Sequence, residues 1–410
     1  MKVKVLQSCR VCGGDDLRKV VDLGEQELTG VFPKTRDEQL TSGPLQLVFC
    51  PKCGLLQLAH SYELTEMYGE NYGYRSGLNS NMVAHLTNKV EYLEHRYNLT
   101  AGDVVVDIGS NDGTTLNAYK TKGIRRIGID PTGAKFQRYY NEGVELVPDF
   151  FSVINYRSIS DKAAKIVTSI SMFYDLESPT EFAAAVEEIL ADDGIWHFEQ
   201  SYMPTMLRQN AYDTICHEHL EYYSLQVIQY ILTTVGMKII DVRMNDVNGG
   251  SFAVTAAKKH SSYKTDDVLV GWLLEREAEA GLHTEEPYKK FAERVKKHKQ
   301  DLSRLVDLLN MKGKKVYGYG ASTKGNVVLQ YCHVTDKQIA AIGEVNEDKF
   351  GAFTPGTHIP IKAEEEIKAL QPDYLLVLPW HFRNMILGKE KEYVRKGGKF
   401  IFPLPYIEII

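Results

Sequence analysis

The feature that most constrains the fold is an alternation of apolar strands and helices that begins near residue 103. DVVVDIGS at 103–110 and IRRIGID at 124–130 are two strand patterns, and VELVPDF, AKIVTSISM and GIWHFEQS follow them. Helical patterns such as SPTEFAAAVEEILADDG lie between these strands. Strands that alternate with helices at this spacing form a mainly parallel sheet with helices on both faces. The sequence therefore predicts an α/β doubly wound sheet, whose ligands bind beyond the carboxyl ends of its strands.

The size and charge of the chain exclude several classes of protein. It has 410 residues, a net charge of -6 and 43% hydrophobic residues, enough for two or three domains. The mild acidity offers no basic surface for nucleic acid. No apolar run approaches the ~20 residues that span a bilayer, and the first ten residues lack the apolar core of a signal peptide. We therefore expect a cytoplasmic protein that binds neither nucleic acid nor membrane.

Four of the six cysteines form two Cys-x-x-Cys pairs, Cys9 with Cys12 and Cys50 with Cys53. Two residues between thiolates let one turn direct both sulfurs at one ion, and two such turns complete a tetrahedral shell around Zn²⁺. A closed shell has no position for a substrate, so the ion is expected to be structural. The alternative is four core cysteines that bind no metal.

The turn DIGSNDG at 107–113, which follows the first strand, is the most informative local motif. Gly109 allows a sharp bend and a close approach of a ligand to the backbone. Asp130 ends the second strand, where a carboxylate can accept the hydroxyls of a ribose. The acids Asp107 and Asp112 would repel a pyrophosphate, so the motif favours a cofactor without one. The alternative is another nucleotide-binding domain whose acids only cap helices.

This turn resembles the first motif of class I S-adenosylmethionine-dependent methyltransferases. The resemblance implies that Asp107 and Gly109 lie near the methionine part of the cofactor and that Asp130 binds its ribose. Asp149 and Phe150 would lie near the adenine. The residues expected at the cofactor are Asp107, Gly109, Asn111, Asp112, Gly113, Asp130, Asp149 and Phe150.

The stretch DTICHEHLEYYS at 213–224 concentrates ionisable side chains on an insertion after the fifth strand. In an extended segment His217 and His219 would point the same way, and Glu221 would complete a set of three metal ligands. One histidine, oriented by Glu218 or a tyrosine, would instead serve as an acid or base. The third alternative is a polar segment that caps the next helix. The residue pattern alone leaves the three open.

The order of motifs along the whole chain extends the resemblance. The cysteine pairs, the Asp-x-Gly turn, HEHLEYYS at 217–224, VNGGS at 247–251 and YGYGASTKGN at 317–326 resemble the sugar C-methyltransferases that modify nucleotide-linked 4-keto-deoxyhexoses. The resemblance implies that His219, preceded by Glu218, removes the proton from the carbon next to the ketone, with C3 as the expected carbon. No metal is needed for this step. The enolate would then take the methyl group.

Deprotonation beside a ketone requires hydrogen-bond donors near the oxygen on which charge develops. The resemblance implies that Tyr74 lines the site. The candidate donors are Tyr74, Tyr174, Tyr222 and His217.

The chain departs from the family pattern at three positions. Cys216 stands where relatives tend to carry a tyrosine, Tyr174 where they carry a histidine, and Asn248 where a histidine precedes the paired glycines. These departures keep the base but leave the proton relay and the sugar open. Methylation of an oxygen or nitrogen is an alternative, as is a nicotinamide-dependent oxidoreductase that uses Gly318 and Gly320. A zinc-containing binding protein without catalysis is the third.

A second α/β unit is expected in the last hundred residues. Gly318-x-Gly320 at a strand–helix junction fits a phosphate, with backbone N–H groups and Lys324 facing the anion. The family resemblance implies that this unit binds the nucleotide diphosphate of the sugar. The residues expected at the substrate are Gly320, Ser322, Lys324, Asn326, Glu344 and Asn248.

These patterns predict four parts. The cofactors expected are S-adenosylmethionine and structural Zn²⁺, the substrate lies between the two α/β domains, and the protein is a monomer or weak homo-oligomer. The predicted parts are a zinc segment at 1–65, a methyltransferase domain at 66–262 with a catalytic insertion at 202–235, a helical connector at 263–312, and a Rossmann-like domain at 313–410.

Overall fold

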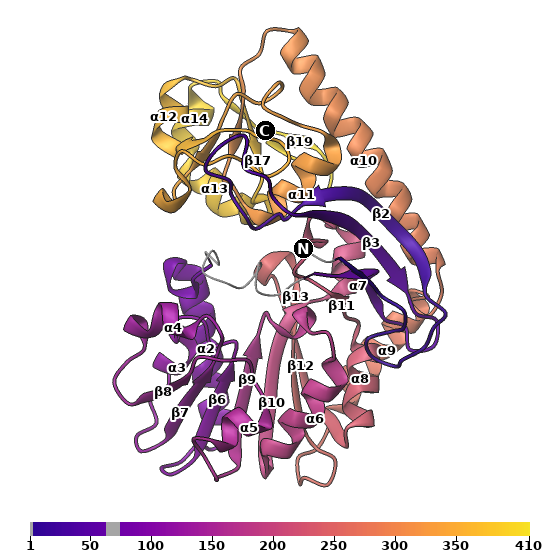
Figure 1. Ribbon diagram of the computed structural model, residues 1–410, viewed down its shortest axis with the longest axis vertical. Helices are drawn as coiled ribbons and strands as arrows, with labels where there is room; N and C mark the ends of the chain where they lie inside the picture. Colours follow the sequence, from indigo (N-terminus) through magenta and orange to yellow (C-terminus); the bar gives the residue numbers. More distant parts are fainter. Residues whose placement is uncertain (1–2, 63–73) are drawn as a thin grey trace.

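The computed structural model describes residues 3–62 and 74–410, so the domain boundary predicted at 65 lies outside the described residues. Two α/β units lie one above the other, and a small N-terminal sheet lies beside the junction between them (Figure 1). Within the described residues, no helix is both long and apolar enough to cross a membrane.

The larger unit is built on a seven-stranded sheet in the order β12-β13-β10-β9-β6-β7-β8. The five strands from β10 to β8 are parallel, and β13 runs antiparallel to both of its neighbours. The predicted doubly wound sheet is confirmed. Its strands are β6 (Val104–Ile108), β7 (Arg125–Ile129), β8 (Val144–Val147), β9 (Ala164–Ile170), β10 (Leu190–Ser201), β12 (Met237–Asn245) and β13 (Ser251–Lys258).

Alternate residues of β6 pack into different cores, because successive side chains of a strand point to opposite faces. Val105 packs with Val90 and Leu93 of α2, whereas Val104 and Val106 belong to the core that contains α6 and α8. Helices therefore cover both faces of the sheet. They include α2 (Ser80–Arg96), α3 (Thr114–Asn117), α4 (Gly133–Phe136), α5 (Val153–Arg157), α6 (Pro179–Ile189) and α8 (Leu225–Thr234). The short α7 (Met203–Arg208) instead packs in the core of the C-terminal unit.

The C-terminal unit has a six-stranded sheet in the order β16-β15-β14-β17-β18-β19, and all pairs except the last are parallel. This is the second α/β unit expected from the sequence. Its elements are β14 (Val316–Tyr319), α11 (Thr323–Cys332), β15 (Ile342–Glu344), β16 (Ile361–Ala363), α12 (Glu364–Ala369), β17 (Tyr374–Val377), α13 (Arg383–Lys389), α14 (Lys391–Arg395), β18 (Lys399–Phe402) and β19 (Glu408–Ile409).

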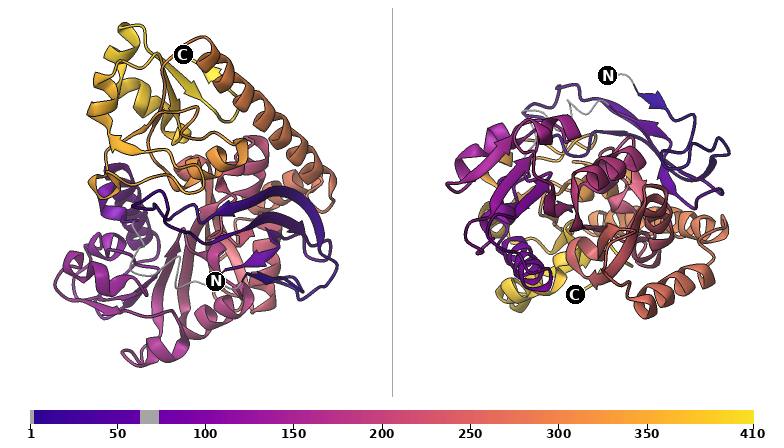
Figure 2. Two further views of the ribbon diagram at one scale, coloured as in Figure 1. Left: turned by 45° about the horizontal axis from the view of Figure 1, so that its top comes forward. Right: turned by 90° about the horizontal axis from the view of Figure 1, so that it is seen from below.

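Two helices connect these units: α9 (Asp267–Glu279) and α10 (Glu286–Met311). The long α10 runs along one side of the molecule from the lower unit to the upper one (Figures 1 and 2). Tyr288, Phe291 and Val295 lie on its buried face and belong to the core of the C-terminal unit. The connector is therefore an integral part of that core.

The N-terminal segment forms a four-stranded sheet in the order β11-β4-β3-β2, which includes one strand from far along the chain. Leu47 and Phe49 of this sheet belong to the core of the C-terminal unit, whereas Cys9 and Cys50 belong to the core of the larger unit. The segment thus bridges both units. Its strands are β1 (Lys4–Val5), which pairs with β5 (His60–Ser61), and β2 (Arg18–Glu27), β3 (Ser42–Phe49), β4 (Leu56–Leu58) and β11 (Glu221–Tyr222).

Candidate functional site

A cavity of about 250 Å³ opens at the carboxyl edge of the seven-stranded sheet. Five of the eight residues predicted at the cofactor line it, and Tyr74 lies on its wall. Those five are Asp107, Gly109, Asn111, Asp130 and Phe150.

The turn after β6 is held against the end of β7. The backbone N–H of Asn111 donates to Oδ2 of Asp130 over 2.7 Å, and Oδ1 of Asp130 accepts from the N–H and the hydroxyl of Thr132. Gly109 has φ of 74°, and a Cβ there would lie 3.0 Å from Met172 Cγ. A side chain at this position would be strained and would crowd the cavity wall.

Asp107 is a buried acid at this edge. Its Oδ1 accepts a hydrogen bond of 2.6 Å from the hydroxyl of Thr168, and only 2% of the residue is exposed. Burial raises the pKa of Asp107 to about 7. A cationic ligand group nearby would favour the ionised form and lower this pKa.

The other three predicted residues lie outside the cavity lining. Asp112 accepts hydrogen bonds from the N–H of Gly77 and the hydroxyl of Thr114 and forms an ion pair with Arg75, so it fixes the segment that follows Tyr74. Gly113 adopts a left-handed conformation before α3. Asp149 is exposed and accepts from the N–H of Phe150.

Much of the cavity wall comes from residues that the sequence motifs did not indicate. Met82 and Leu86 of α2 contribute, as does the loop after β9. Ligands of a parallel sheet bind at the carboxyl ends of its strands, so the sequence could have predicted that the β9 loop lines the cavity. No sequence motif could have predicted the contribution of α2. The loop residues are Ser171, Met172, Asp175, Leu176 and Glu177.

The segment that carries His219 is attached to all three parts of the molecule. Its β11 pairs with β4 of the N-terminal sheet, and the N–H of Leu220 donates to the carbonyl of Tyr174 in the larger unit over 2.8 Å. On the other side, η4 (Tyr212–Thr214) packs against α11 of the C-terminal unit. The histidine therefore lies where the three parts meet.

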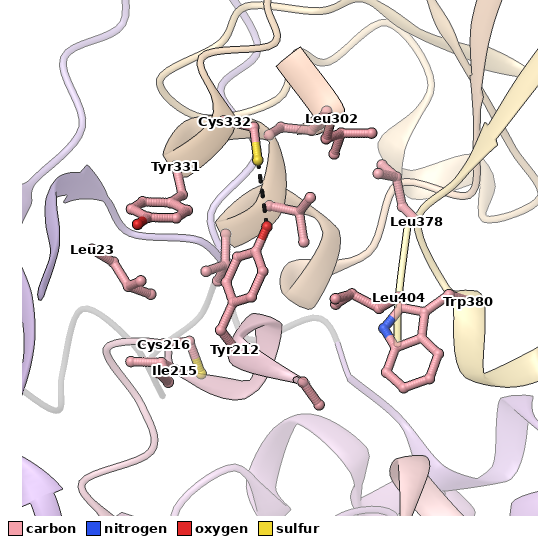
Figure 3. Packing of buried hydrophobic residues seen from close by; sticks show 14 of the residues in the cluster. Leu23, Tyr212, Ile215, Cys216, Leu302, Tyr331, Cys332, Leu378, Trp380 and Leu404 are labelled. Atoms are coloured by element: carbon pink, nitrogen blue, oxygen red, sulfur yellow. Dashed lines mark hydrogen bonds between the residues drawn. The ribbon is translucent and has the colours of Figure 1, made fainter. Parts of the chain in front are cut away.

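Tyr212 inserts into the core of the C-terminal unit (Figure 3). Its hydroxyl lies 2.9 Å from Nδ1 of His298 and 3.4 Å from Sγ of Cys332. Nε2 of His298 lies 2.6 Å from the carbonyl oxygen of Pro403. A carbonyl can only accept, so Nε2 carries the hydrogen and Nδ1 accepts from Tyr212. This buried chain of hydrogen bonds anchors the segment.

The surroundings of His219 keep its ring in the neutral form, which can accept a proton. Nδ1 lies 2.9 Å from the carbonyl oxygen of Thr214. Because that oxygen only accepts, Nδ1 carries the hydrogen and Nε2 keeps a free lone pair in the neutral ring. Burial, aided by the charge of Lys324, lowers the pKa of His219 to about 4. The ring is neutral at physiological pH and contacts the ring of Tyr174, with centroids 4.4 Å apart.

Tyr174 links this histidine to the cavity. It belongs to η3 (Phe173–Asp175), and its neighbours Met172 and Asp175 line the cavity wall. His219 is therefore separated from the cavity by one short turn of chain.

The other candidates of this stretch face different surroundings. Glu218 packs against Gly30, where a Cβ would lie 2.7 Å from its Oε1, and burial raises the pKa of Glu218. His217 is fully buried, and its ring packs edge-on against Tyr62 of the N-terminal segment. The hydroxyl of Tyr222 donates to the carbonyl of Thr214, which also binds His219. The structure brings Tyr174 and Tyr222 to His219 but directs His217 elsewhere.

The metal alternative for this stretch finds no geometric support. Among the described residues, only the four cysteines form a cluster of three or more potential ligands. Their ligand atoms lie within 4.8 Å of one another, with Cys9 and Cys53 3.5 Å apart and Cys12 and Cys50 3.5 Å apart. Sulfurs bound to one tetrahedral Zn²⁺ at ~2.3 Å lie about 3.8 Å apart. The four cysteines therefore fit a zinc ion.

The residues predicted at the substrate mostly shape the turn after β14. Ser322 caps α11 by accepting from the N–H of Gly325, and Oε2 of Glu344 accepts from the N–H of Ala321. Gly320 has φ of 78°. Asn326 is buried and donates to the carbonyl of Thr29.

Lys324 is the predicted substrate residue that reaches the other unit. Its Nζ donates to the carbonyl of Asn248 over 3.1 Å. Burial lowers the pKa of both His219 and His381, and the charge of Lys324 lowers it further. Trp380 lies beside this group and donates to Oδ2 of Asp213 over 2.8 Å. The sequence motifs did not indicate Asp213 or Trp380, because their proximity depends on how the units pack.

Comparisons with known proteins agree with this arrangement. Family models for a zinc binding domain, a methyltransferase domain and a C-methyltransferase C-terminal domain match residues 9–68, 80–242 and 246–405. The C-methyltransferase NovU of Streptomyces niveus is 32% identical over 412 aligned positions, and the alignment covers 100% of this chain and 98% of that protein.

Solved structures of methyltransferases are also similar, each over 43% of this chain. An S-adenosylmethionine-dependent methyltransferase from Clostridium acetobutylicum is 11% identical with a TM-score of 0.33, and 92% of that chain is covered. The magnesium protoporphyrin IX methyltransferase of Synechocystis is 15% identical with a TM-score of 0.31, and 79% of that chain is covered.

The predicted fold, a class I methyltransferase sheet between a four-cysteine segment and a Rossmann-like unit, is confirmed. The chain is similar to NovU over its full length, and three family models match successive parts of it. The chain belongs to the S-adenosylmethionine-dependent C-methyltransferase family.

Proposed function

We propose that this C-methyltransferase acts on a nucleotide-linked 4-keto-deoxyhexose and methylates the carbon next to the ketone, C3. The observation that carries the proposal is the neutral His219, whose Nδ1 is bound to the carbonyl of Thr214 and whose Nε2 is left to accept a proton. A base of this kind is needed to make a carbon nucleophile.

The cavity at the sheet edge is proposed to bind S-adenosylmethionine. Its acids suit a cationic cofactor, with Asp107 near the charged methionine part and Asp130 near the ribose. Phe150 offers an apolar surface for the adenine. When bound, S-adenosylmethionine supplies an electrophilic methyl group.

In the proposed reaction Nε2 of His219 takes the proton from the substrate carbon, and the electron pair moves toward the carbonyl oxygen. Tyr74 and Tyr174 are the proposed hydrogen-bond donors to this oxygen, since both lie at or beside the cavity. Tyr222 and Thr214 position the histidine ring. The electron pair would then return to the carbon and form its bond to the methyl group, while the bond between that methyl group and the donor's sulfur breaks and leaves its electron pair on a neutral thioether. The proton stays on His219 until solvent removes it.

The C-terminal unit is proposed to bind the nucleotide diphosphate. The N-terminus of α11 presents backbone N–H groups, and Lys324 extends from its first turn toward Asn248 of the larger unit. Affinity for the distant nucleotide would align the sugar between base and methyl group.

The proposal is tested with His219→Ala, since loss of the base should reduce methylation by about a hundredfold or more. The matched control is His260→Ala, because His260 is exposed and lies far from the cavity at an ion pair with Asp192. Purified protein is incubated with S-adenosylmethionine and a panel of nucleotide 4-keto sugars. Mass spectrometry detects the added methyl group, and NMR locates it on carbon, oxygen or nitrogen.

A second measurement isolates the base. Without a methyl donor, wild-type protein should exchange the hydrogen next to the ketone with deuterium from solvent, and His219→Ala should not. Equal exchange by the variant would exclude His219 as the base. A methyl group on oxygen or nitrogen would replace the proposed reaction with the corresponding alternative.

A further inference from the structure

Arg10 lies between the two cysteines of the first pair, and only 1% of its side chain is exposed. Its Nη1 donates to the carbonyl of Leu58 over 2.7 Å. Its Nη2 donates to the carbonyl of His60 over 3.1 Å and to the hydroxyl of Ser61 over 2.9 Å. The guanidinium is therefore fixed by the chain around β4 and β5 as well as by the cysteine turn.

The same guanidinium faces two carboxylates, one at the cavity and one in the segment that carries His219. Its Nε lies 3.4 Å from Oε2 of Glu177 and 3.7 Å from Oε1 of Glu221. The hydroxyl of Ser61 donates to the same oxygen of Glu177 over 2.9 Å. Glu177 lines the cofactor cavity, and Glu221 follows His219 by two residues and begins β11.

Arg10 is the buried cation that faces Glu221, and the Glu221 side chain is fully buried against it. Burial raises the pKa of Glu221 well above its usual range, and the charge of Arg10 opposes this rise. Because the interior around the pair is closely packed, a change in the shape of the Arg10 side chain would let the start of β11 move. Such a movement would disturb the segment that carries His219.

We propose that Arg10 is a positioning residue that couples the four-cysteine site to catalysis by fixing Glu177 at the cofactor cavity and Glu221 beside His219. The inference rests on the proposed function of the cavity and of His219. Zn²⁺ at the cysteines would fix the backbone on both sides of Arg10, so the metal would influence methylation without contacting the cofactor or the sugar.

The test compares Arg10→Lys with Arg18→Lys. Lysine keeps the charge of Arg10 but cannot donate to Leu58, His60 and Ser61 in the planar geometry of the guanidinium. Arg18 is a matched control in the same segment, because its exposed side chain pairs with Asp16 and Glu285. Zinc content, thermal midpoint, S-adenosylmethionine affinity without acceptor, kcat and KM are measured for each protein.

Arg10→Lys should keep one zinc per chain and fold, while its Kd for S-adenosylmethionine rises and its kcat falls by about tenfold each. The KM for the sugar should not change, and Arg18→Lys should match the wild type throughout. Wild-type donor affinity and kcat in Arg10→Lys would overturn the inference. So would a loss of zinc that accounts for the loss of affinity, because Arg10 would then only maintain the metal site.

Ser61→Ala provides a milder variant if Arg10→Lys does not fold. It removes the hydroxyl that joins Arg10 to Glu177 but leaves every charge in place. We expect unchanged zinc content and about threefold weaker donor binding. Unchanged donor binding by Ser61→Ala would overturn the inference. Wild-type protein that binds no S-adenosylmethionine would instead overturn the proposed function itself.

Discussion

The turns after β6 and β14 occupy equivalent places in the two sheets and share one device. In each, an acid at the end of the second strand accepts a hydrogen bond from a backbone N–H of the turn. Asp130 binds Asn111 over 2.7 Å, and Glu344 binds Ala321 over 2.8 Å. The backbone geometry of a doubly wound sheet thus produces the same arrangement twice.

The charges around the two turns differ. Three acids, Asp107, Asp112 and Asp130, lie at the first turn, whose helix α3 has only four residues. At the second turn Lys324 lies in the first turn of a ten-residue helix, and Nζ of Lys349 donates to the carbonyl of Ala321. Sheet topology determines where a ligand can bind, and a few side chains determine whether it is a cation or an anion.

The largest expected effects come from placing a branched side chain at the glycine of either turn. Gly109→Val would place a branched side chain at φ of 74°, against Met172, and Gly320→Val would do so at φ of 78°, against Pro379. We expect Gly109→Val to weaken donor binding by about a hundredfold or more while leaving nucleotide binding intact, and Gly320→Val to do the reverse. Calorimetry with each ligand checks this. A variant that loses both ligands equally would show that the turns are not independent sites.

Lys324→Gln should produce the next largest effect. Nucleotide-sugar affinity should fall by about tenfold, because a charge-assisted contact to the anion is lost. The charge of Lys324 also helps to lower the pKa of His219 to about 4, so this pKa should rise in the variant. The base acts when neutral, so activity is lost as the pH falls through this pKa. The acid limb of the pH profile of deuterium exchange should therefore shift to higher pH. An unshifted limb would contradict the proximity of the two groups.

The smallest expected effect concerns the acidic turn. The pKa of Asp107 is about 7, and a cationic donor prefers its ionised form. Donor affinity should therefore increase by about threefold as the pH rises to about 7 and level off above it. Asp107→Asn should bind more weakly above pH 7 and lose this dependence. If donor affinity in Asp107→Asn still changes with pH as it does in the wild type, a group other than Asp107 causes the pH dependence.

The sequence predicted those parts of the molecule that depend on local patterns. The strand–helix alternation predicts both sheets because each strand is a short apolar run, and cysteine spacing predicts the metal cluster because each pair lies in one turn. Local patterns also predicted the positions of Asp107, Gly109 and Asp130, because the parallel sheet aligns the ends of β6 and β7.

The remainder of the site arises from contacts between distant segments. The strand β11 has two residues and pairs with β4, so no periodicity could reveal it. The contact between Arg10 and Glu221 and the contact between Trp380 and Asp213 depend on how the parts pack. Even His217, two residues from His219, points into the N-terminal sheet, because the segment turns at this place instead of continuing as an extended strand.

The burial of Tyr212 has a consequence for biosynthesis. Its hydrogen-bonded partner His298 binds the carbonyl of Pro403, and Phe402 and Leu404 belong to the same core. During translation the ribosome releases the insertion long before these residues emerge. The apolar surface around Tyr212 must therefore remain without its native neighbours until β18 has left the exit tunnel, which makes the nascent chain a candidate for chaperone protection.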